Sequence, residues 1–245
     1  TMNLLIISEA FFPEGSGGEL TTYLHAKLLH NNGVNIRVIT ASSSSISKSK
    51  IDGLTIYNVI RRKPTKYSIV NKILPLLKGS LRHLFEWADV IYMTGWFPAI
   101  PFIKHMFKKP VVVHLHSSFP ACPIGASYNL AKDSLCTLNS VFPKCAKCIV
   151  SYERFKETNT LETIISSLLN STIGLAYINF LKHADAAVFV SRYQKNLVLR
   201  RLPTIADRSF VIYNPLPKLP HVPVRGDDLG YFGGISYLKG FHTLI

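Results

Sequence analysis

Two histidines near the middle of the chain are the first candidates for chemistry. His114 and His116 occupy alternate positions at the end of the apolar run 111–115, and alternate residues of a strand point to one face of its sheet. A histidine there can donate a hydrogen bond to a sugar hydroxyl or a phosphate, or move a proton near neutral pH. His116 lies nearer the strand end and is the candidate catalytic residue; a hydrogen-bonded structural histidine is the alternative for both.

A glycine-rich turn follows the first apolar run, 4–8. Residues 9–18 read EAFFPEGSGG and lead into a helical pattern. Free N–H groups at a helix N-terminus bind anions, and glycine lets the backbone approach them. Gly17 and Gly18 are therefore predicted to bind phosphate, with an ordinary tight turn as the alternative. The turn lacks the G-x-G-x-x-G spacing, and the second apolar run ends in T-A-S without an acidic residue, which disfavours a dinucleotide-dependent oxidoreductase.

Four cysteines lie downstream of the two histidines. One pair has the C-x-x-C spacing of a metal knuckle, and two further thiols could complete a tetrahedral site; the four are Cys122, Cys136, Cys145 and Cys148. A structural zinc ion, one or two disulfides, and free thiols are the three alternatives. Four cysteines in 245 residues do not resemble a disulfide-dense secreted scaffold.

The elements that must position these residues alternate along the chain. Short, nearly continuous apolar runs predict strands covered on both faces, at 4–8, 35–40, 54–60, 90–93, 111–115, 186–190 and 210–213. Helical patterns lie between them, at 19–31, 68–87, 156–183 and 192–202. This alternation predicts an α/β fold with a doubly wound, Rossmann-like parallel sheet and a ligand site beyond the carboxyl ends of its strands.

Three details of this pattern are open to a structural test. The first helix, 19–31, carries Leu20, Leu24, Leu28 and Leu29 on one side. The polar stretch 42–50 is predicted to be a loop. The stretch 214–226 holds four prolines and no periodic pattern, and is predicted to be a semi-rigid linker. The linker divides the chain into a domain at 1–213 and the beginning of a second domain at 227–245.

The charge balance gives a further indication of partners. With 28 Lys and Arg against 14 Asp and Glu, the formal net charge is +14, which favours anionic partners. The basic, amphipathic segment 63–82 could dock on an anionic membrane surface or pack on the sheet with a hydrated basic side. No RNP-like, zinc-finger or basic heptad pattern is present, so nucleic acid is not a predicted partner. The sequence has no signal peptide and no run of about 18 apolar residues, so we expect a cytoplasmic protein, peripheral at most to the inner face of the membrane.

Five motifs in order resemble the retaining glycosyltransferases of family 4, which have the GT-B fold. They are the glycine pair Gly17-Gly18, K-P-V-V-V-H-L-H at 109–116, V-S-R-Y-Q-K at 190–195, V-I-Y-N-P at 211–215, and F-G-G-I-S-Y-L-K-G at 232–240. The resemblance places His116 near the transferred sugar, Ser191 among the substrate-binding residues, and Lys239 on the diphosphate of the donor. Ser117 replaces the usual aspartate, and Gly234 replaces the usual arginine.

The resemblance implies the N-terminal half of a GT-B enzyme, a glycosyltransferase of hexosyltransferase type that moves a sugar from a nucleotide-sugar to a glycan or lipid-linked acceptor with retention. It implies no metal or other cofactor for catalysis. Most donor contacts in the family, including a paired-glutamate motif, come from the second domain, so this chain is expected to be inactive by itself. The alternative is a non-catalytic domain that binds an acceptor, a lipid or a protein.

Overall fold

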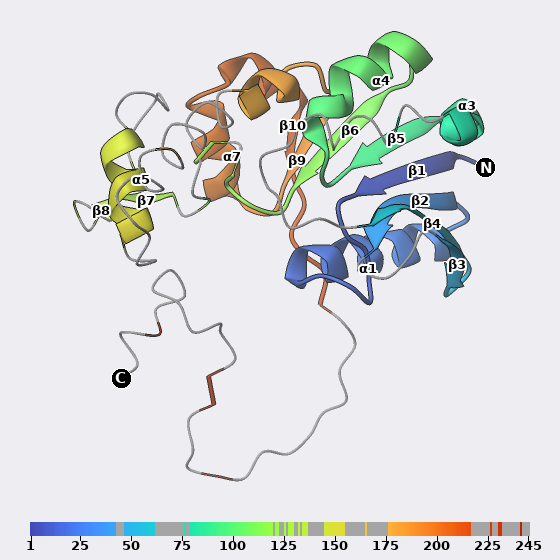
Figure 1. Cartoon of the computed structure of the whole chain (residues 1–245), viewed down its shortest axis with the longest axis horizontal. Helices are drawn as coiled ribbons and strands as arrows, with labels where there is room; N and C mark the ends of the chain where they lie inside the picture. Colours follow the sequence, from blue (N-terminus) through green and yellow to red (C-terminus); the bar gives the residue numbers. More distant parts are fainter. Residues whose placement is uncertain are drawn as a thin grey trace. The chain divides into compact units, whose positions relative to one another are not determined.

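The structure is a computed structural model of the whole chain (Figure 1). The residues that it describes are 1–42, 47–61, 76, 79–119, 121–122, 125, 127–129, 132, 134–136, 145–154, 165, 176–216, 226, 230–231 and 241. Contacts divide the chain into two units, Thr1–Pro215 and Leu216–Ile245. In the second unit, the rings of Tyr231 and Phe241 lie 5.4 Å apart.

The first unit is built on an eight-stranded sheet with the order β10-β9-β6-β5-β1-β2-β4-β3. Its strands are β1 (Asn3–Ser8), β2 (Asn35–Ser42), β3 (Ser47–Ile51), β4 (Leu54–Arg61), β5 (Val90–Met93), β6 (Val111–Leu115), β9 (Ala186–Phe189) and β10 (Ser209–Val211). All neighbouring pairs are parallel except β3 with β4. The chain leaves the central strand β1 toward β2 and β4, then returns to β5 on its other side. The sheet therefore reverses its winding direction between β1 and β5, where ligands bind in open α/β sheets.

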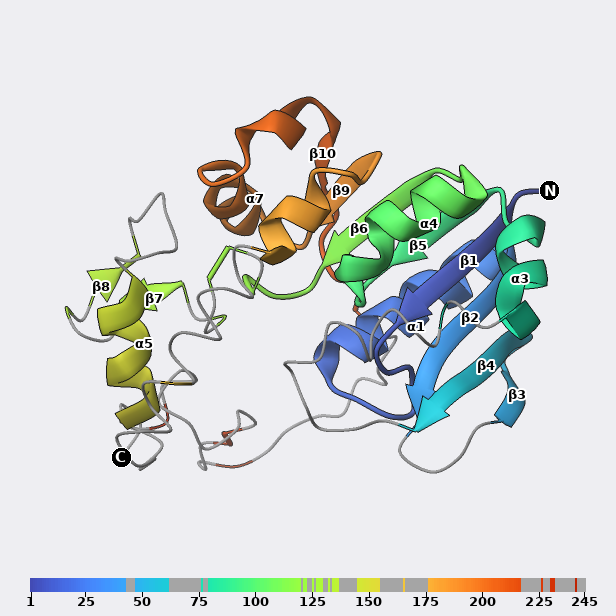
Figure 2. The same ribbon diagram turned by 45° about the horizontal axis from the view of Figure 1, so that its top comes forward.

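Helices cover both faces of this sheet (Figures 1 and 2). They are α1 (Gly17–Asn31), η2 (Gly79–Leu81), α3 (Arg82–Trp87), η3 (Phe97–Ala99), α4 (Ile100–Phe107), α7 (Arg192–Leu199) and η4 (Pro203–Arg208). Alternate residues of β1 enter two separate cores: Ile6 packs in the cluster that contains Tyr23 of α1, and Ile7 packs in the cluster that contains Ile103 of α4. The doubly wound α/β fold is thus confirmed.

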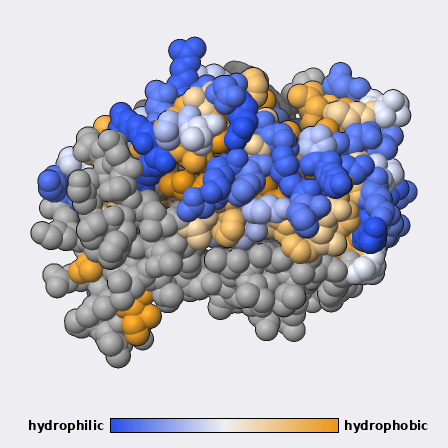
Figure 3. Space-filling view, turned by 90° about the horizontal axis from the view of Figure 1, so that it is seen from above, coloured by the Kyte–Doolittle hydropathy of each residue, from blue (hydrophilic) through white to orange (hydrophobic). Residues whose placement is uncertain are grey.

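A small group of elements lies between β6 and β9 in the chain, and two of its residues, Cys145 and Ile149, pack in the main core cluster. It consists of the two-stranded sheet β7 (Tyr128–Asn129) and β8 (Ser134–Leu135) and the helix α5 (Cys145–Arg154). On the face shown in Figure 3, the described residues mix hydrophilic and hydrophobic patches rather than forming one continuous apolar surface.

The predicted loop at 42–50 is wrong over its second half, because β3 begins at Ser47 and pairs antiparallel with β4. Asp52 and Gly53 form the two-residue connection, with φ of 48° and 81°, and two positive φ values are the mark of a tight hairpin turn. The Asp-Gly pair was the signal in the sequence. It is easily missed because nearly every residue of β3 is exposed, so this edge strand has no apolar pattern, and its lysines suit an edge.

This turn gives a first prediction. Replacing Gly53 with alanine is expected to lower the free energy of unfolding by about 1–2 kcal/mol, because an L-residue is strained in the left-handed region. The new Cβ would also lie 2.6 Å from Nε2 of His30. Urea unfolding of the Gly53→Ala and Gly79→Ala variants provides a matched comparison, since a Cβ at Gly79 meets nothing within 4 Å. Equal stability of the two variants would contradict the prediction.

Helix α1 buries only part of the predicted leucine side, because Leu24 and Leu29 pack against the core cluster that contains Ile6, whereas Leu20 and Leu28 do not. Leu20 and Leu28 are 37% and 57% exposed, and the buried residues of the helix are Thr21, Thr22, Tyr23 and Ala26. Thr22 lies over the sheet next to β6, where its Oγ1 is 3.2 Å from Nε2 of His116. Leucine spacing alone therefore identified Leu24 and Leu29, which pack on the core, and missed the fully buried residues of the helix.

Two other helix boundaries differ from the prediction. The pattern at 192–202 ends as an α-helix at Leu199, before Pro203 begins the 3-10 helix η4. Of the patterns 68–87 and 156–183, the described residues include a helix at 82–87 and a helical stretch at 176–181; most of both patterns lies outside the described residues.

Candidate functional site

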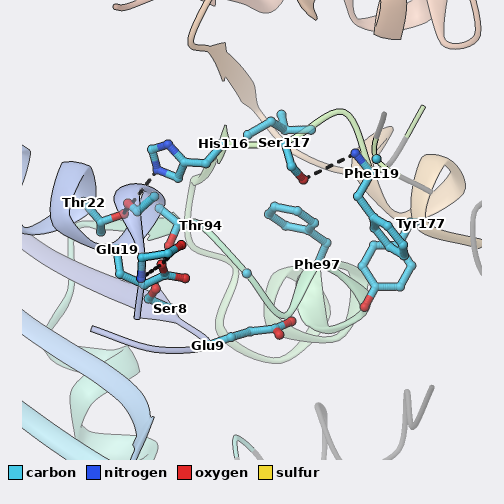
Figure 4. Close-up of a pocket in the computed structure, with 15 residues that line it drawn as sticks. Ser8, Glu9, Glu19, Thr22, Thr94, Phe97, His116, Ser117, Phe119 and Tyr177 are labelled. Atoms are coloured by element: carbon cyan, nitrogen blue, oxygen red, sulfur yellow. Dashed lines mark hydrogen bonds between the residues drawn. The ribbon is translucent and has the colours of Figure 1, made fainter. Parts of the chain in front are cut away.

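A cavity of about 450 Å³ opens at the point where the sheet reverses its winding direction (Figure 4). Its wall includes Ser8 at the end of β1, Thr94 after β5, and His116 after β6. The first turn of α1 supplies Gly18 and closes one side. The predicted location beyond the carboxyl ends of the strands is therefore where the structure has its cavity.

His116 lies in this cavity wall against helix α1. Its Nε2 lies 3.2 Å from Oγ1 of Thr22, and the Thr22 hydroxyl donates to the carbonyl oxygen of Gly18 at 2.9 Å. With the hydroxyl proton directed at Gly18, Thr22 is the acceptor and Nε2 of His116 carries the proton. Nδ1 of His116 is buried and has no hydrogen-bond partner among the described residues.

The electrostatic environment keeps His116 neutral. Burial and the neighbouring His25 lower the pKa of His116 to about 4, and the nearby Glu19 carboxylate opposes this shift. At neutral pH the ring is therefore an uncharged hydrogen-bonding group. Of the two roles expected from sequence, this environment favours hydrogen bonding over proton transfer from an imidazolium.

His114 points to the same side of the sheet as His116 but is fully buried beneath α1. Its ring lies 4.4 Å from that of His116 and 5.4 Å from that of His25, and a hydrogen bond joins its Nδ1 to the hydroxyl of Tyr92. Burial, followed by His116 and His25, lowers the pKa of His114 to about 3. His114 is therefore a structural histidine that supports the strand end carrying His116.

The two glycines of the first turn differ in their surroundings. A Cβ on Gly18 would lie 3.2 Å from Cβ of His116, whereas a Cβ on Gly17 would meet nothing within 4 Å. Gly18 thus permits the close approach of α1 to β6, and Gly17 leaves its backbone open. The Glu19 carboxylate accepts hydrogen bonds from N and Oγ of Ser16, at 2.7 and 2.9 Å, which caps the helix start.

Ser191 is the N-cap of α7. Its Oγ accepts a hydrogen bond from N of Gln194 at 3.1 Å, a role that stabilises the helix start. Gln194 is buried, donates from Nε2 to the carbonyl oxygen of Ser117 at 2.9 Å, and accepts from N of Val190. Ser191 and Gln194 therefore anchor the segment that follows His116. Substrate binding by Ser191 stays a prediction.

Other predicted features fall wholly or mainly outside the described residues. Lys239 and Gly234 are among them, and so is most of the basic segment 63–82. Across the part of the chain that the structure describes, no helix has the length and apolar character needed to cross a membrane.

The four cysteines lie near one another and form no disulfide bond. Burial is the main cause that raises the pKa of Cys145 to about 11, and the other three cysteines raise it further. Cys122 accepts a hydrogen bond from N of Ser127 at 3.3 Å, and Cys148 donates to the carbonyl oxygen of Tyr128 at 3.5 Å. Among the described residues, no group of three or more His, Cys, Asp or Glu side chains is arranged to hold a metal ion. The thiols share a neighbourhood without forming a preassembled site.

Several cavity residues carried no clear signal in the sequence. Glu9 follows β1, and three aromatic side chains, Phe97, Phe119 and Tyr177, line the side of the cavity away from Thr22 (Figure 4). They come from segments far apart in the chain, so no local spacing connects them. Glu9 could have been suspected, since it directly follows a predicted strand end at the expected ligand site.

Comparison with known proteins agrees with this fold. Residues 15–217 match the family model of Glycosyltransferase Family 4. Sucrose-phosphate synthase from Thermosynechococcus elongatus superposes with a TM-score of 0.54 at 11% identity, covering 87% of this chain and 48% of that one. HepE from Anabaena, solved with UDP and glucose, gives a TM-score of 0.49 at 15% identity, covering 88% and 45%. A search of curated proteins found no match.

The family match and the superposed fold identify the chain as the N-terminal half of a GT-B glycosyltransferase. The chain belongs to Glycosyltransferase Family 4. It spans about half the length of the solved structures that it matches.

Proposed function

We propose that this chain is the acceptor-side half of a retaining glycosyltransferase that moves a sugar from a nucleotide-sugar to a glycan or lipid-linked acceptor. The observation that carries the proposal is the cavity at the carboxyl ends of β1, β5 and β6, in a chain of this family. His116 lies in its wall as a neutral hydrogen-bonding group. No metal or other cofactor takes part in the proposed transfer.

The donor would be held largely from outside this half. Within it, the open backbone at Gly17 supports a role in approaching the donor phosphates, since N–H groups at a helix start attract anions. Lys239 is proposed to contact the diphosphate, on the strength of its match to the family motif. Because most donor contacts belong to a second domain in this family, we expect this chain alone to be inactive.

Incubation with a panel of UDP-, GDP-, ADP- and dTDP-sugars and of candidate acceptors tests the proposal. The complete gene product should form a glycosylated acceptor detectable by mass spectrometry, with the anomeric configuration of the donor preserved in the NMR spectrum of the product. The 245-residue chain should form none. Product formation with inverted configuration would reject retention, and absence of any product from the complete protein would reject the transferase.

The excess of basic residues motivates a second part of the proposal, which is peripheral binding at the cytoplasmic membrane face. A net charge of +14 attracts anionic lipid head groups, where a lipid-linked acceptor would be presented. Co-sedimentation with vesicles of phosphatidylcholine alone, or with added phosphatidylglycerol, should show binding only to the anionic vesicles. Equal binding to both vesicle types would reject this part.

We also propose that the cysteines take up a structural zinc ion. The four thiols share one neighbourhood, and metal binding can draw ligands together because it is coupled to folding. We predict about one zinc per chain in protein purified without metal-affinity resin, and loss of the metal in a Cys145→Ser variant. Less than about half an equivalent in the unmodified chain would reject zinc and leave a disulfide or free thiols.

A further inference from the structure

We propose that the cavity selects an acceptor pyranose without anionic substituents, stacked on the aromatic wall and hydrogen-bonded by Glu9. This inference rests on the proposed function, because it describes the acceptor of that reaction. It concerns the charge and shape of the cavity rather than the chemistry of transfer.

The aromatic wall is a fixed platform. The ring of Tyr177 lies 5.1 Å from that of Phe119 and 6.3 Å from that of Phe97, and both pairs meet edge to face. Such pairs are favourable arrangements that hold each ring in place. Figure 4 shows the three rings together on one side of the cavity. The C–H face of a pyranose is apolar and suits a flat aromatic surface, whereas its hydroxyls need polar partners.

The opposite wall supplies those partners and carries negative charge. The hydroxyls of Ser8, Thr22 and Thr94 line it together with the carboxylates of Glu9 and Glu19. Among the described residues that line the cavity there is no lysine or arginine. This contrasts with the chain as a whole, whose net charge is +14. A phosphate or carboxylate on the acceptor would be repelled by the carboxylates of Glu9 and Glu19. A neutral sugar ring would not be repelled and could hydrogen-bond to the same groups.

The backbone around Glu9 is arranged to hold its carboxylate at the cavity. A Cβ on Gly95 would lie 2.6 Å from Cγ of Glu9 and 3.1 Å from its backbone N, so only glycine gives the Glu9 side chain its place. The next residue, Trp96, has a left-handed backbone with φ of 53°, and its N–H donates to Oε1 of Glu9 at 3.4 Å.

A left-handed backbone is strained in a residue other than glycine, and such strain persists mainly where the surrounding structure enforces it at functional sites. Trp96 is buried and belongs to the main core, which enforces its conformation. Trp96, through its backbone N–H, and Gly95, through its lack of a side chain, thus both hold the carboxylate of Glu9 in position.

Binding to the 245-residue chain tests the inference directly, by saturation-transfer NMR with four probes: methyl glucoside, methyl N-acetylglucosaminide, methyl glucuronide and glucose 6-phosphate. We expect the first two to bind at least about 10-fold more tightly than the two anionic sugars. Glu9→Gln should reduce this preference by about 10-fold, whereas Phe119→Ala should weaken binding of all four probes alike. Glu86→Gln removes the same charge from an exposed ion pair with Arg82 and should change nothing.

The outcomes separate this inference from the proposed function. Binding of the anionic sugars as tightly as the neutral ones, no binding of any probe, or an unchanged preference in Glu9→Gln would overturn the inference. Transfer to a phosphorylated acceptor by the complete protein would overturn it while upholding the transferase. Selective binding of neutral sugars without any transfer by the complete protein would uphold the cavity and reject the enzyme.

Discussion

Replacing His116 with asparagine is expected to lower the turnover number of sugar transfer by about 100-fold, with a much smaller change in the Michaelis constant of the donor. His116 lies in the cavity wall with its Nε2 next to Thr22 and its pKa lowered to about 4. A neutral hydrogen-bonding group held in a partly buried site acts mainly where charge develops in the transition state, and removing one such group typically lowers turnover by about 100-fold. Steady-state kinetics of the complete protein gives both constants.

An exposed histidine provides the matched control for this experiment. His105 lies on the outer side of α4, so His105→Asn should leave both kinetic constants unchanged. Far-ultraviolet circular dichroism and the urea midpoint of each variant separate a catalytic effect from unfolding. A His116→Asn enzyme with turnover within about threefold of the unmodified protein would remove His116 from the mechanism.

Acid conditions are expected to destabilise the fold through the buried histidines. The pKa values of His114 and His116 are lowered to about 3 and about 4 by burial, below the value of about 6.5 that they have in the unfolded chain. Between those limits the unfolded state binds more protons, so the free energy of unfolding falls as the pH drops below 6.5. The slope should approach about 1.4 kcal/mol per pH unit for each histidine.

Urea unfolding at pH 7.5, 6.5, 5.5 and 5.0 measures this slope. His114→Leu should lower stability at pH 7.5, because it leaves the hydroxyl of Tyr92 without its partner, and it should reduce the slope below pH 6.5 by about one proton. His105→Leu removes an exposed histidine and should leave the slope unchanged. The same slope in the His114→Leu and unmodified chains would show that this histidine is not the source of acid sensitivity.

The sheet was predictable because its strands are buried on both faces. Continuous apolar runs such as 4–8 and 111–115 leave few alternatives, and the structure has strands at Asn3–Ser8 and Val111–Leu115. The exposed edge strand β3 was missed because it buries almost nothing. The side of α1 that faces the sheet was predicted only in part, since Leu24 and Leu29 pack on the core but Leu20 and Leu28 are exposed.

Site residues could be predicted from the sequence only where the residue type and its position at a strand end together indicate a ligand contact. His116 and Gly18 followed from that position, and the structure brings both to the cavity. Glu9 and Phe119 become neighbours of the same cavity only through the winding of the sheet. The left-handed backbone of Trp96 leaves no trace in the sequence, because tryptophan rarely adopts it. Sequence periodicity predicts helices and strands, but it does not predict long-range contacts or local backbone strain.

The location of the bound sugar tests the central claim most directly. Amide correlation spectra of the isotope-labelled 245-residue chain, titrated with methyl glucoside, should show saturable shifts at Ser8, Thr94, Gly95 and His116, which surround the cavity. The exposed helix positions of α4, such as His105, should not shift. Saturable shifts confined to residues away from the ends of β1, β5 and β6, or no saturable shifts at all, would contradict the assignment of this cavity as the acceptor site.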